Sequence, residues 1–255
     1  MFQIGITERG DAALDDSWVD WVYKKDKPAI LITKNAPLLQ EKHPDIFFKN
    51  VIIHVTCTGL GGTIFEPNVP KPSVVWKWIR EKPASIQRKL VLRVDPICPS
   101  LFQIKNDKFD GEKYFLNVRN LFSVAAEFQL RCRISFLDCY PHVKERFKAE
   151  GIDINKDYAN YEYNGIHLPL DARKKWMTIF ETVTDKKLPF EICGEPGLTC
   201  TGCVSKMDLD IFGLDMTSTT VEANQRIACK CLGFKKELLT NKVQCPHGCL
   251  YCYWK

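Results

Sequence analysis

Six short apolar runs, separated by longer amphipathic stretches, limit the folds that are open to this chain. The runs are residues 2–6, 29–33, 51–56, 90–94, 132–137 and 189–193. They have the length of strands, and the third is the richest in β-branched residues. Between them, residues 74–81, 115–129 and 171–184 carry apolar positions at helical spacing. This alternation predicts β–α units and a parallel sheet, and therefore an α/β fold.

Polar or glycine residues lie at the carboxyl end of each of these runs. They include Thr7 and Arg9, Lys34 and Asn35, Thr56 and Thr58, Arg93 and Asp95, Ser135 and Asp138, and Cys193 and Glu195. The carboxyl ends of parallel strands meet at one edge, and barrel enzymes build their active sites there. One such residue is more often a helix cap, but six in series predict a shared cavity. We therefore predict a partial (β/α) TIM-like barrel over residues 1–192.

Three cysteines near the end of the chain, Cys245, Cys249 and Cys252, have the spacing CxxxCxxC. Gly248 permits a tight turn, so the three thiolates can reach three corners of one 4Fe–4S cubane. One iron then has no protein ligand and is open to a small molecule, as the open position of catalytic zinc is. The alternative is a structural zinc knuckle, with a fourth ligand from His247 or an upstream cysteine.

Five further cysteines precede this motif, namely Cys193, Cys200, Cys203, Cys229 and Cys231. Their spacing suits a second metal site with one thiol to spare. That site is either a second, closed 4Fe–4S cluster or a structural zinc site. We expect residues 193–255 to form a cysteine-rich segment that packs on the barrel within the same domain.

Composition and charge add few restrictions. The 255 residues suffice for one large barrel, and the formal charge of +5 takes no account of bound metal. A cubane held by three thiolates carries about −1 and one held by four about −2, so the basic balance decides little. No apolar run approaches membrane length and no leader precedes the first strand, which predicts a cytoplasmic protein with no membrane contact. Twelve cysteines then favour metal ligation over disulfides.

Eight segments, in their order along the chain, resemble the DUF1848 family. They are Thr7-Glu8-Arg9-Gly10-Asp11, Ile32-Thr33-Lys34-Asn35-Ala36-Pro37, Val55-Thr56-Cys57-Thr58-Gly59-Leu60-Gly61, Glu66-Pro67-Asn68-Val69-Pro70, Leu92-Arg93-Val94-Asp95-Pro96, Ile134-Ser135-Phe136-Leu137-Asp138, Asn224-Gln225-Arg226 and the CxxxCxxC motif. That family is similar to the spore photoproduct lyase branch of the radical S-adenosylmethionine (SAM) proteins. Most radical SAM enzymes place the cluster loop after their first strand, whereas here it follows the last. A barrel tolerates this permutation because its first and last elements are neighbours.

The resemblance implies a barrel of the radical SAM type, with the cysteine-rich segment covering its mouth. It implies that Cys245, Cys249 and Cys252 hold an open 4Fe–4S cluster to which SAM binds. For the second site it favours Cys193, Cys203, Cys229 and Cys231 as ligands. Cys200 departs from the family pattern.

The implied activity is reductive cleavage of SAM to a 5′-deoxyadenosyl radical that abstracts hydrogen from a substrate. The resemblance implies no substrate: a lyase or nucleotide-modifying reaction on a nucleic-acid base is one hypothesis, and a metabolite or peptide is equally open. A flavodoxin or ferredoxin would donate the electron. A different hypothesis is a zinc-stabilised barrel that binds nucleic acid or protein and performs no chemistry.

Further candidate residues follow from their positions after strands. Thr56, Thr58, Gly59, Arg93 and Asp95 are the candidates to contact SAM. Cys139 and Tyr140 are candidate radical relays, for which ordinary packing is the alternative.

Overall fold

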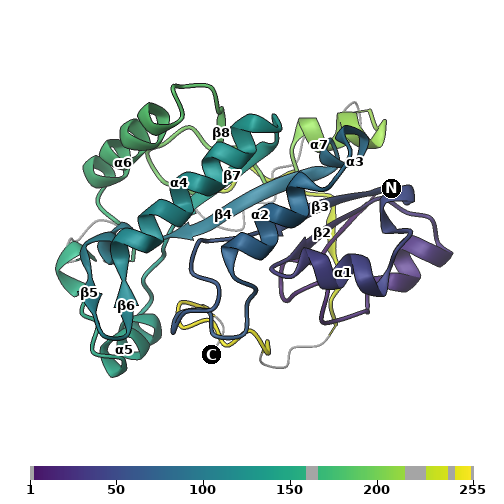
Figure 1. The fold of residues 1–255 in the computed structure, drawn as a ribbon. Coiled ribbons are helices and arrows are strands. Elements are labelled where there is room, and N and C mark those ends of the chain that lie inside the picture. The colour runs from purple at the N-terminus through teal and green to yellow at the C-terminus, as the bar shows by residue number, and fades with distance from the viewer. Residues whose placement is uncertain (1–2, 159–165, 216–227, 241–244, 254–255) are drawn as a thin grey trace.

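One seven-stranded sheet organises the protein, a computed structural model that describes residues 3–158, 166–215, 228–240 and 245–253 (Figure 1). All its neighbouring strands pair in parallel, in the order β8-β7-β4-β3-β2-β1-β9. The strands are β1 (Ile4–Ile6), β2 (Ala29–Thr33), β3 (Val51–Thr56), β4 (Leu90–Ile97), β7 (Arg131–Phe136), β8 (Phe190–Ile192) and β9 (Lys235–Glu237). The six predicted strands are confirmed, and β9 is an addition from the cysteine-rich segment.

The sheet is not closed in the part of the chain that the structure describes. Its edge strands are β8 and β9, and they do not pair with each other. The predicted barrel is therefore, at the level of backbone pairing, an open parallel sheet in a mixed α/β fold. Strand β9 extends the sheet beyond β1, with Ile4 opposite Lys235 and Ile6 opposite Glu237.

Helices connect the strands and cover the sheet. They are α1 (Ala36–Lys42), α2 (Pro72–Arg80), α3 (Ala84–Gln87), α4 (Gly111–Glu127), α5 (Pro141–Ala149), α6 (Leu170–Val183) and α7 (Lys206–Phe212). Short helical turns span Asp20–Lys24, Ile46–Phe48, Pro99–Gln103 and Asn155–Tyr158, and β5 (Lys105–Asn106) pairs with β6 (Phe109–Asp110). The three long predicted helices are confirmed as α2, α4 and α6. Helix α4 begins earlier than predicted because the Asp110 carboxylate caps it, accepting from the Lys113 N–H at 3.2 Å.

The two faces of the sheet are buried differently. Alternate residues of β3, such as Ile53 and Val55, pack in the main core with apolar residues of α2, α4 and α6. On the other face, Ile52 joins a smaller core with Leu209 and Phe212 of α7. The carboxyl half of that second face carries polar side chains. It is there that a cavity forms.

None of the described helices combines the length and the apolar character that crossing a bilayer demands.

Candidate functional site

A cavity of about 720 Å³ lies at the carboxyl ends of the strands. Thr33, Thr56, Arg93, Ser135 and Cys193, which lie on β2, β3, β4 and β7 and directly after β8, all contribute to its lining. The shared cavity that the strand-end residues predicted is therefore present. Its volume is in the range of sites that enclose small molecules.

Seven cysteines line this one cavity in two sets. The terminal cysteines are Cys245, Cys249 and Cys252, and the inner cysteines are Cys193, Cys203, Cys229 and Cys231. These are the seven residues that the sequence analysis named as metal ligands. The fold thus brings two soft donor sets, far apart in sequence, to the same chamber.

Asp11 fixes the loop of the terminal cysteines from the end of β1. Its carboxylate lies 2.7 Å from Nε2 of His247, and the other ring nitrogen of His247 lies 3.3 Å from the carbonyl oxygen of Asn68. Each ring nitrogen thus has a hydrogen-bond partner. Burial would raise the pKa of Asp11, but the hydrogen bond and charge of His247, with Thr33, hold it below its ordinary value. His247 therefore ties the loop to Asp11 and Asn68.

A second anchor of this loop is the buried carboxylate of Glu66. It accepts hydrogen bonds from the Tyr251 hydroxyl, from Lys34 Nζ at 2.7 Å and from the Thr58 hydroxyl at 2.8 Å. Burial opposes the charge of Lys34, but the Glu66 carboxylate raises the pKa of the lysine and keeps it an ammonium. The aromatic residue between the last two cysteines is thus tied to the ends of β2 and β3.

The loop itself turns at Gly248, where φ is +65°, a conformation that favours glycine. The Cys252 N–H donates to the Cys249 carbonyl at 3.1 Å, and Arg146 donates to the carbonyl oxygens of Cys249 and Cys252. All three thiols are half-buried and line the cavity. Burial raises the pKa of Cys249 to about 12, so a bound metal would have to displace its proton.

The terminal and the inner cysteines differ in how closely their donor atoms approach one another. Among the described residues, the terminal cysteines do not bring three ligand atoms within 4.8 Å of one another. Three soft donors on one loop, facing one chamber, are a donor set of the kind that holds an iron–sulfur cluster.

The inner cysteines pack against one another as a buried cluster. The sulfurs of Cys193 and Cys203 are 3.3 Å apart, and the Cys203 N–H donates to the Cys231 sulfur at 3.0 Å. Cys200 lies outside this cluster, and its thiol donates to the Glu195 carbonyl at 3.2 Å. The structure thus separates Cys200 from the four, as the resemblance implied.

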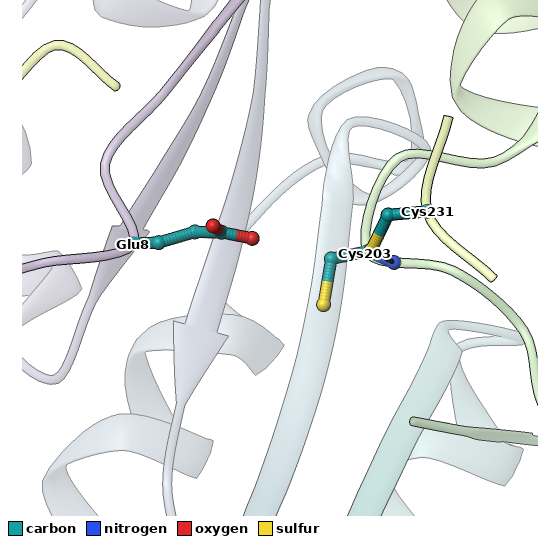
Figure 2. A group of neighbouring side chains, drawn as sticks. All are labelled: Glu8, Cys203 and Cys231. Atoms are coloured by element: carbon teal, nitrogen blue, oxygen red, sulfur yellow. Dashed lines mark hydrogen bonds between the residues drawn. The ribbon is translucent and has the colours of Figure 1, made fainter. Parts of the chain in front are cut away.

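Glu8 is the site residue that sequence reasoning missed. Figure 2 shows its side chain extending from the loop after β1 toward Cys203 and Cys231, and one ligand atom of each of the three lies within 4.8 Å of the others. The available signal was its position after the first strand, beside Thr7 and Arg9. Nothing in the spacing of the cysteines could reveal a partner about 200 residues away along the chain.

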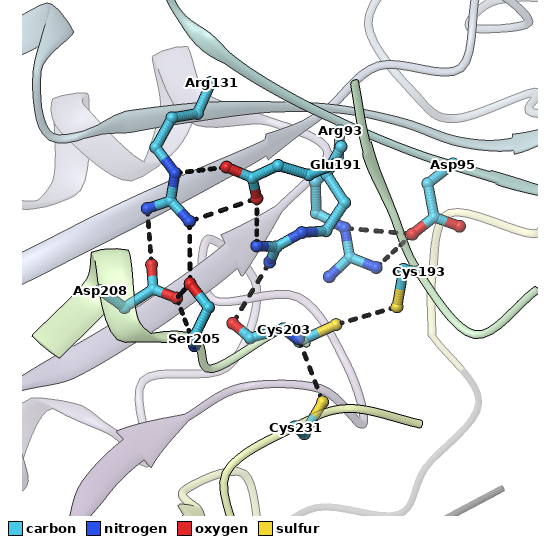
Figure 3. Close-up of polar contacts among 10 residues, drawn as sticks. Arg93, Asp95, Arg131, Glu191, Cys193, Cys203, Ser205, Asp208 and Cys231 are labelled. Carbon is cyan, nitrogen blue, oxygen red and sulfur yellow. Dashed lines mark hydrogen bonds and ion pairs between the residues drawn. The ribbon is translucent and has the colours of Figure 1, made fainter. Parts of the chain in front are cut away.

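A buried ion-pair network fixes the loop that carries Cys203 (Figure 3). Arg131 pairs with Glu191 at 2.6 Å and with Asp208 at 2.7 Å, and Asp208 caps α7 through Ser205. Arg133 pairs with Glu191 and donates to the Cys203 carbonyl at 3.2 Å. This arrangement pairs each buried charge with an opposite one, although Nε of Arg133 has no hydrogen-bond partner, and it orients the backbone of Cys203.

The charges around the inner cysteines favour a thiolate at Cys203. Hydrogen bonds with the Cys193 and Cys231 thiols lower the pKa of Cys203, and the nearby charges of Arg93 and Arg133 lower it further. A thiolate is the form that ligates metal.

The candidate SAM contacts divide into two groups. Thr56, Arg93 and Asp95 line the cavity, where Asp95 pairs with Arg93 and accepts from the Ser135 hydroxyl at 2.6 Å. Thr58 and Gly59 lie behind it. Thr58 holds Glu66, and Gly59, with φ +93°, packs against Tyr114.

The two candidate relays are adjacent but differ in access. Tyr140 lines the cavity, whereas Cys139 is fully buried, with its N–H bonded to the Ile166 carbonyl at 2.8 Å. The segment Asn224-Gln225-Arg226 lies outside the described residues.

Comparisons with known proteins give one match. The model of a family described as a domain of unknown function, DUF1848, matches residues 19–254. No curated protein and no solved structure matches the chain.

Proposed function

This chain belongs to the DUF1848 family, and we propose that it is a radical SAM enzyme whose open 4Fe–4S cluster is held by Cys245, Cys249 and Cys252. The observation that carries the proposal is the placement of these three thiols on one anchored loop, at the wall of a cavity formed by the strand ends. In this proposal the open sheet is a partial (β/α) barrel, and the cysteine-rich segment covers its mouth. The protein would act in the cytoplasm.

The chemistry of cleavage would belong to the cofactor: a reduced cluster supplies the electron that splits SAM into methionine and a 5′-deoxyadenosyl radical, which abstracts hydrogen from the substrate. The chain's own contribution is positioning. Asp11, Glu66 and Arg146 hold the cysteine loop through His247, Tyr251 and the loop carbonyls.

Polar groups of the cavity would bind SAM or the substrate. The Arg93–Asp95 pair is fixed by Ser135, so it presents an oriented guanidinium and carboxylate to the chamber. Thr56 adds a hydroxyl from the neighbouring strand. Preorganised groups of this kind bind a polar ligand without the cost of ordering them. Tyr140 lines the same space and is the better placed of the two candidate relays.

The test is the substitution Cys249→Ala in anaerobically reconstituted protein. We expect 5′-deoxyadenosine formation from SAM to be lost, while far-ultraviolet circular dichroism stays unchanged because none of the seven strands includes the loop. The matched control is Cys200→Ala, which removes a thiol outside both sets and should retain cleavage.

Cleavage retained in Cys249→Ala would refute the assignment of the cluster. Protein purified without oxygen should be brown from iron–sulfur absorption. A colourless protein that contains zinc alone would instead support the hypothesis of a zinc-stabilised module that binds nucleic acid or protein. A flavodoxin or ferredoxin is the proposed electron donor for the assay.

A further inference from the structure

Glu8 meets two of the inner cysteines at the cavity wall. One carboxylate oxygen of Glu8 and the sulfurs of Cys203 and Cys231 lie within 4.8 Å of one another (Figure 2). No other set of three such ligand atoms is that close among the residues that the structure describes. The Cys193 sulfur lies next to this group, 3.3 Å from that of Cys203.

This spacing is that of donors around one ion. At a metal–sulfur distance near 2.3 Å, two sulfurs of a tetrahedral zinc site are roughly 3.8 Å apart. The 3.3 Å between Cys193 and Cys203 is close to that value. A cubane would need the sulfurs spread over separate irons.

The Glu8 carboxylate also contacts Lys235, and this contact is compatible with a role as a metal ligand. Lys235 Nζ lies 2.7 and 2.8 Å from its two oxygens, so one oxygen can bind a metal while the other accepts from the ammonium. The ammonium also offsets part of the charge. Three thiolates and one carboxylate with a divalent ion leave −2, which Lys235 reduces to −1. The Cys203 N–H also donates to the Cys231 sulfur at 3.0 Å, which holds the two donors side by side.

The sheet brings the donors together. Strand β9 follows Cys229 and Cys231 closely in sequence and pairs with β1, so the cysteine segment arrives beside the loop that carries Glu8. The Glu8 N–H donates to the Glu237 carboxylate of β9 at 3.0 Å, which fixes the loop. Glu8 therefore occupies a built position in the cavity wall.

We propose that Glu8 is a metal ligand, and that with Cys203, Cys231 and a further inner cysteine it binds one zinc-class divalent ion. The mixed carboxylate–thiolate set is borderline in softness, which suits zinc. The site faces the chamber, so the ion contributes to its wall. The proposal does not rest on SAM chemistry, because the terminal cysteines are not among its donors.

The experiment isolates this site in the variant Cys245→Ala/Cys249→Ala/Cys252→Ala, loaded with zinc or with cobalt(II). X-ray absorption at the zinc edge should show one oxygen or nitrogen scatterer beside the sulfurs. Glu8→Gln in this background should weaken zinc binding at least ~10-fold in a competition titration with a chelator. The matched control Glu41→Gln, which changes an exposed carboxylate of α1, should bind as the background does.

Ligand exchange separates coordination from a structural role. Glu8→Cys should restore tight binding and add thiolate-to-cobalt charge-transfer absorption, which a merely structural carboxylate would not do. An all-sulfur zinc shell in the background variant overturns the proposal. Equal zinc affinity of Glu8→Gln and Glu41→Gln also overturns it. So does a Glu8→Cys spectrum without added absorption, and this result decides the question even if Glu8→Gln does not fold. None of these outcomes changes the result expected for Cys249→Ala.

Discussion

Asp11 satisfies more groups than any other carboxylate near the terminal cysteines. Its oxygens accept from the Thr33 hydroxyl at 2.6 Å, the Lys34 N–H at 2.7 Å and the Ala13 N–H at 2.8 Å, besides contacting His247. The carboxylate is almost fully buried, so its charge depends on these partners. One residue thereby couples the ends of β1 and β2 to the loop.

Asp11→Asn should therefore lower activity more than it disturbs the fold. The amide keeps the shape but removes the charge that holds His247, and loss of such a supporting residue typically costs ~10 to 100-fold in metal affinity or activity. Iron content and 5′-deoxyadenosine formation are the measurements. Asp15→Asn, which removes a nearby charge that accepts from Ser17, is the control. Equal iron content in the two variants would show that Asp11 has no role in holding the loop.

Glu195 predicts a pH dependence of stability. Burial raises the pKa of its carboxyl to about 7 against the opposing effect of Phe136 N–H and Arg173. The folded state thus binds the proton more tightly than the unfolded state, whose pKa is near 4.5. Stability from this group is complete below pH 4.5 and is lost as pH rises toward 7, by roughly 3 kcal/mol.

Chemical denaturation of the metal-free protein between pH 5 and 8 measures this slope. Glu195→Gln cannot ionise and should flatten the curve, whereas the exposed Glu181→Gln should leave it unchanged. Parallel curves for wild type and Glu195→Gln would mean that Arg173 keeps the carboxyl ionised throughout.

Gly202 allows the segment that carries Cys203 to pack closely against the segment that carries Cys231. A Cβ at this position would lie 2.3 Å from the Lys230 carbonyl oxygen and 2.6 Å from Cys231 Cα, and both are backbone atoms. Gly202→Ala should therefore push the segment of Cys203 away from that of Cys231 and lower zinc affinity at the inner site at least ~10-fold. The competition titration measures it. Gly10→Ala, whose Cβ would meet only the flexible Leu239 side chain, should retain zinc. Unchanged affinity in Gly202→Ala would contradict this account of the packing.

The strands and helices differ in how well the sequence predicts them. The sequence predicts strand β3 clearly, because its apolar residues are β-branched and buried. They are Val51, Ile52, Ile53 and Val55. Strand β9 is Lys-Lys-Glu and carries no apolar pattern, so only its pairing with β1 defines it. Helix α5 buries only Val143 and Phe147 and helix α7 is short, so tertiary contacts determine them more than periodicity does.

The residues of the candidate site also differ in how well the sequence predicts them. The cysteine spacing indicated both donor sets, because ligands close in sequence leave a pattern. Glu8, Asp11 and Glu66 meet their partners only after folding, across separations that no local pattern records. Thr58 and Gly59 were placed correctly after β3, but the side on which their loop packs depends on Glu66 and Tyr114.

At the scale of the whole molecule, the two donor sets predict a mixed metal content. Protein purified without oxygen should contain about four irons and one zinc per chain, because a cubane takes four irons and the inner site one ion. Cys249→Ala should lose the iron and keep the zinc, and Gly202→Ala the reverse. Elemental analysis by mass spectrometry measures both. Seven or eight irons without zinc would place a second cubane at the inner cysteines.

The size of the chamber restricts what can be transformed inside it. About 720 Å³ is the room of a site for one or two small molecules. If SAM binds there as proposed, a folded partner or an intact double helix would not fit beside it at the strand ends. A nucleic-acid substrate would have to turn a single nucleotide out of its stack. The enzyme would then prefer positions where the free energy of unstacking and unpairing that nucleotide is small. Mismatched, damaged or unpaired positions would then react ahead of regular duplex, before any contact reads the identity of the base.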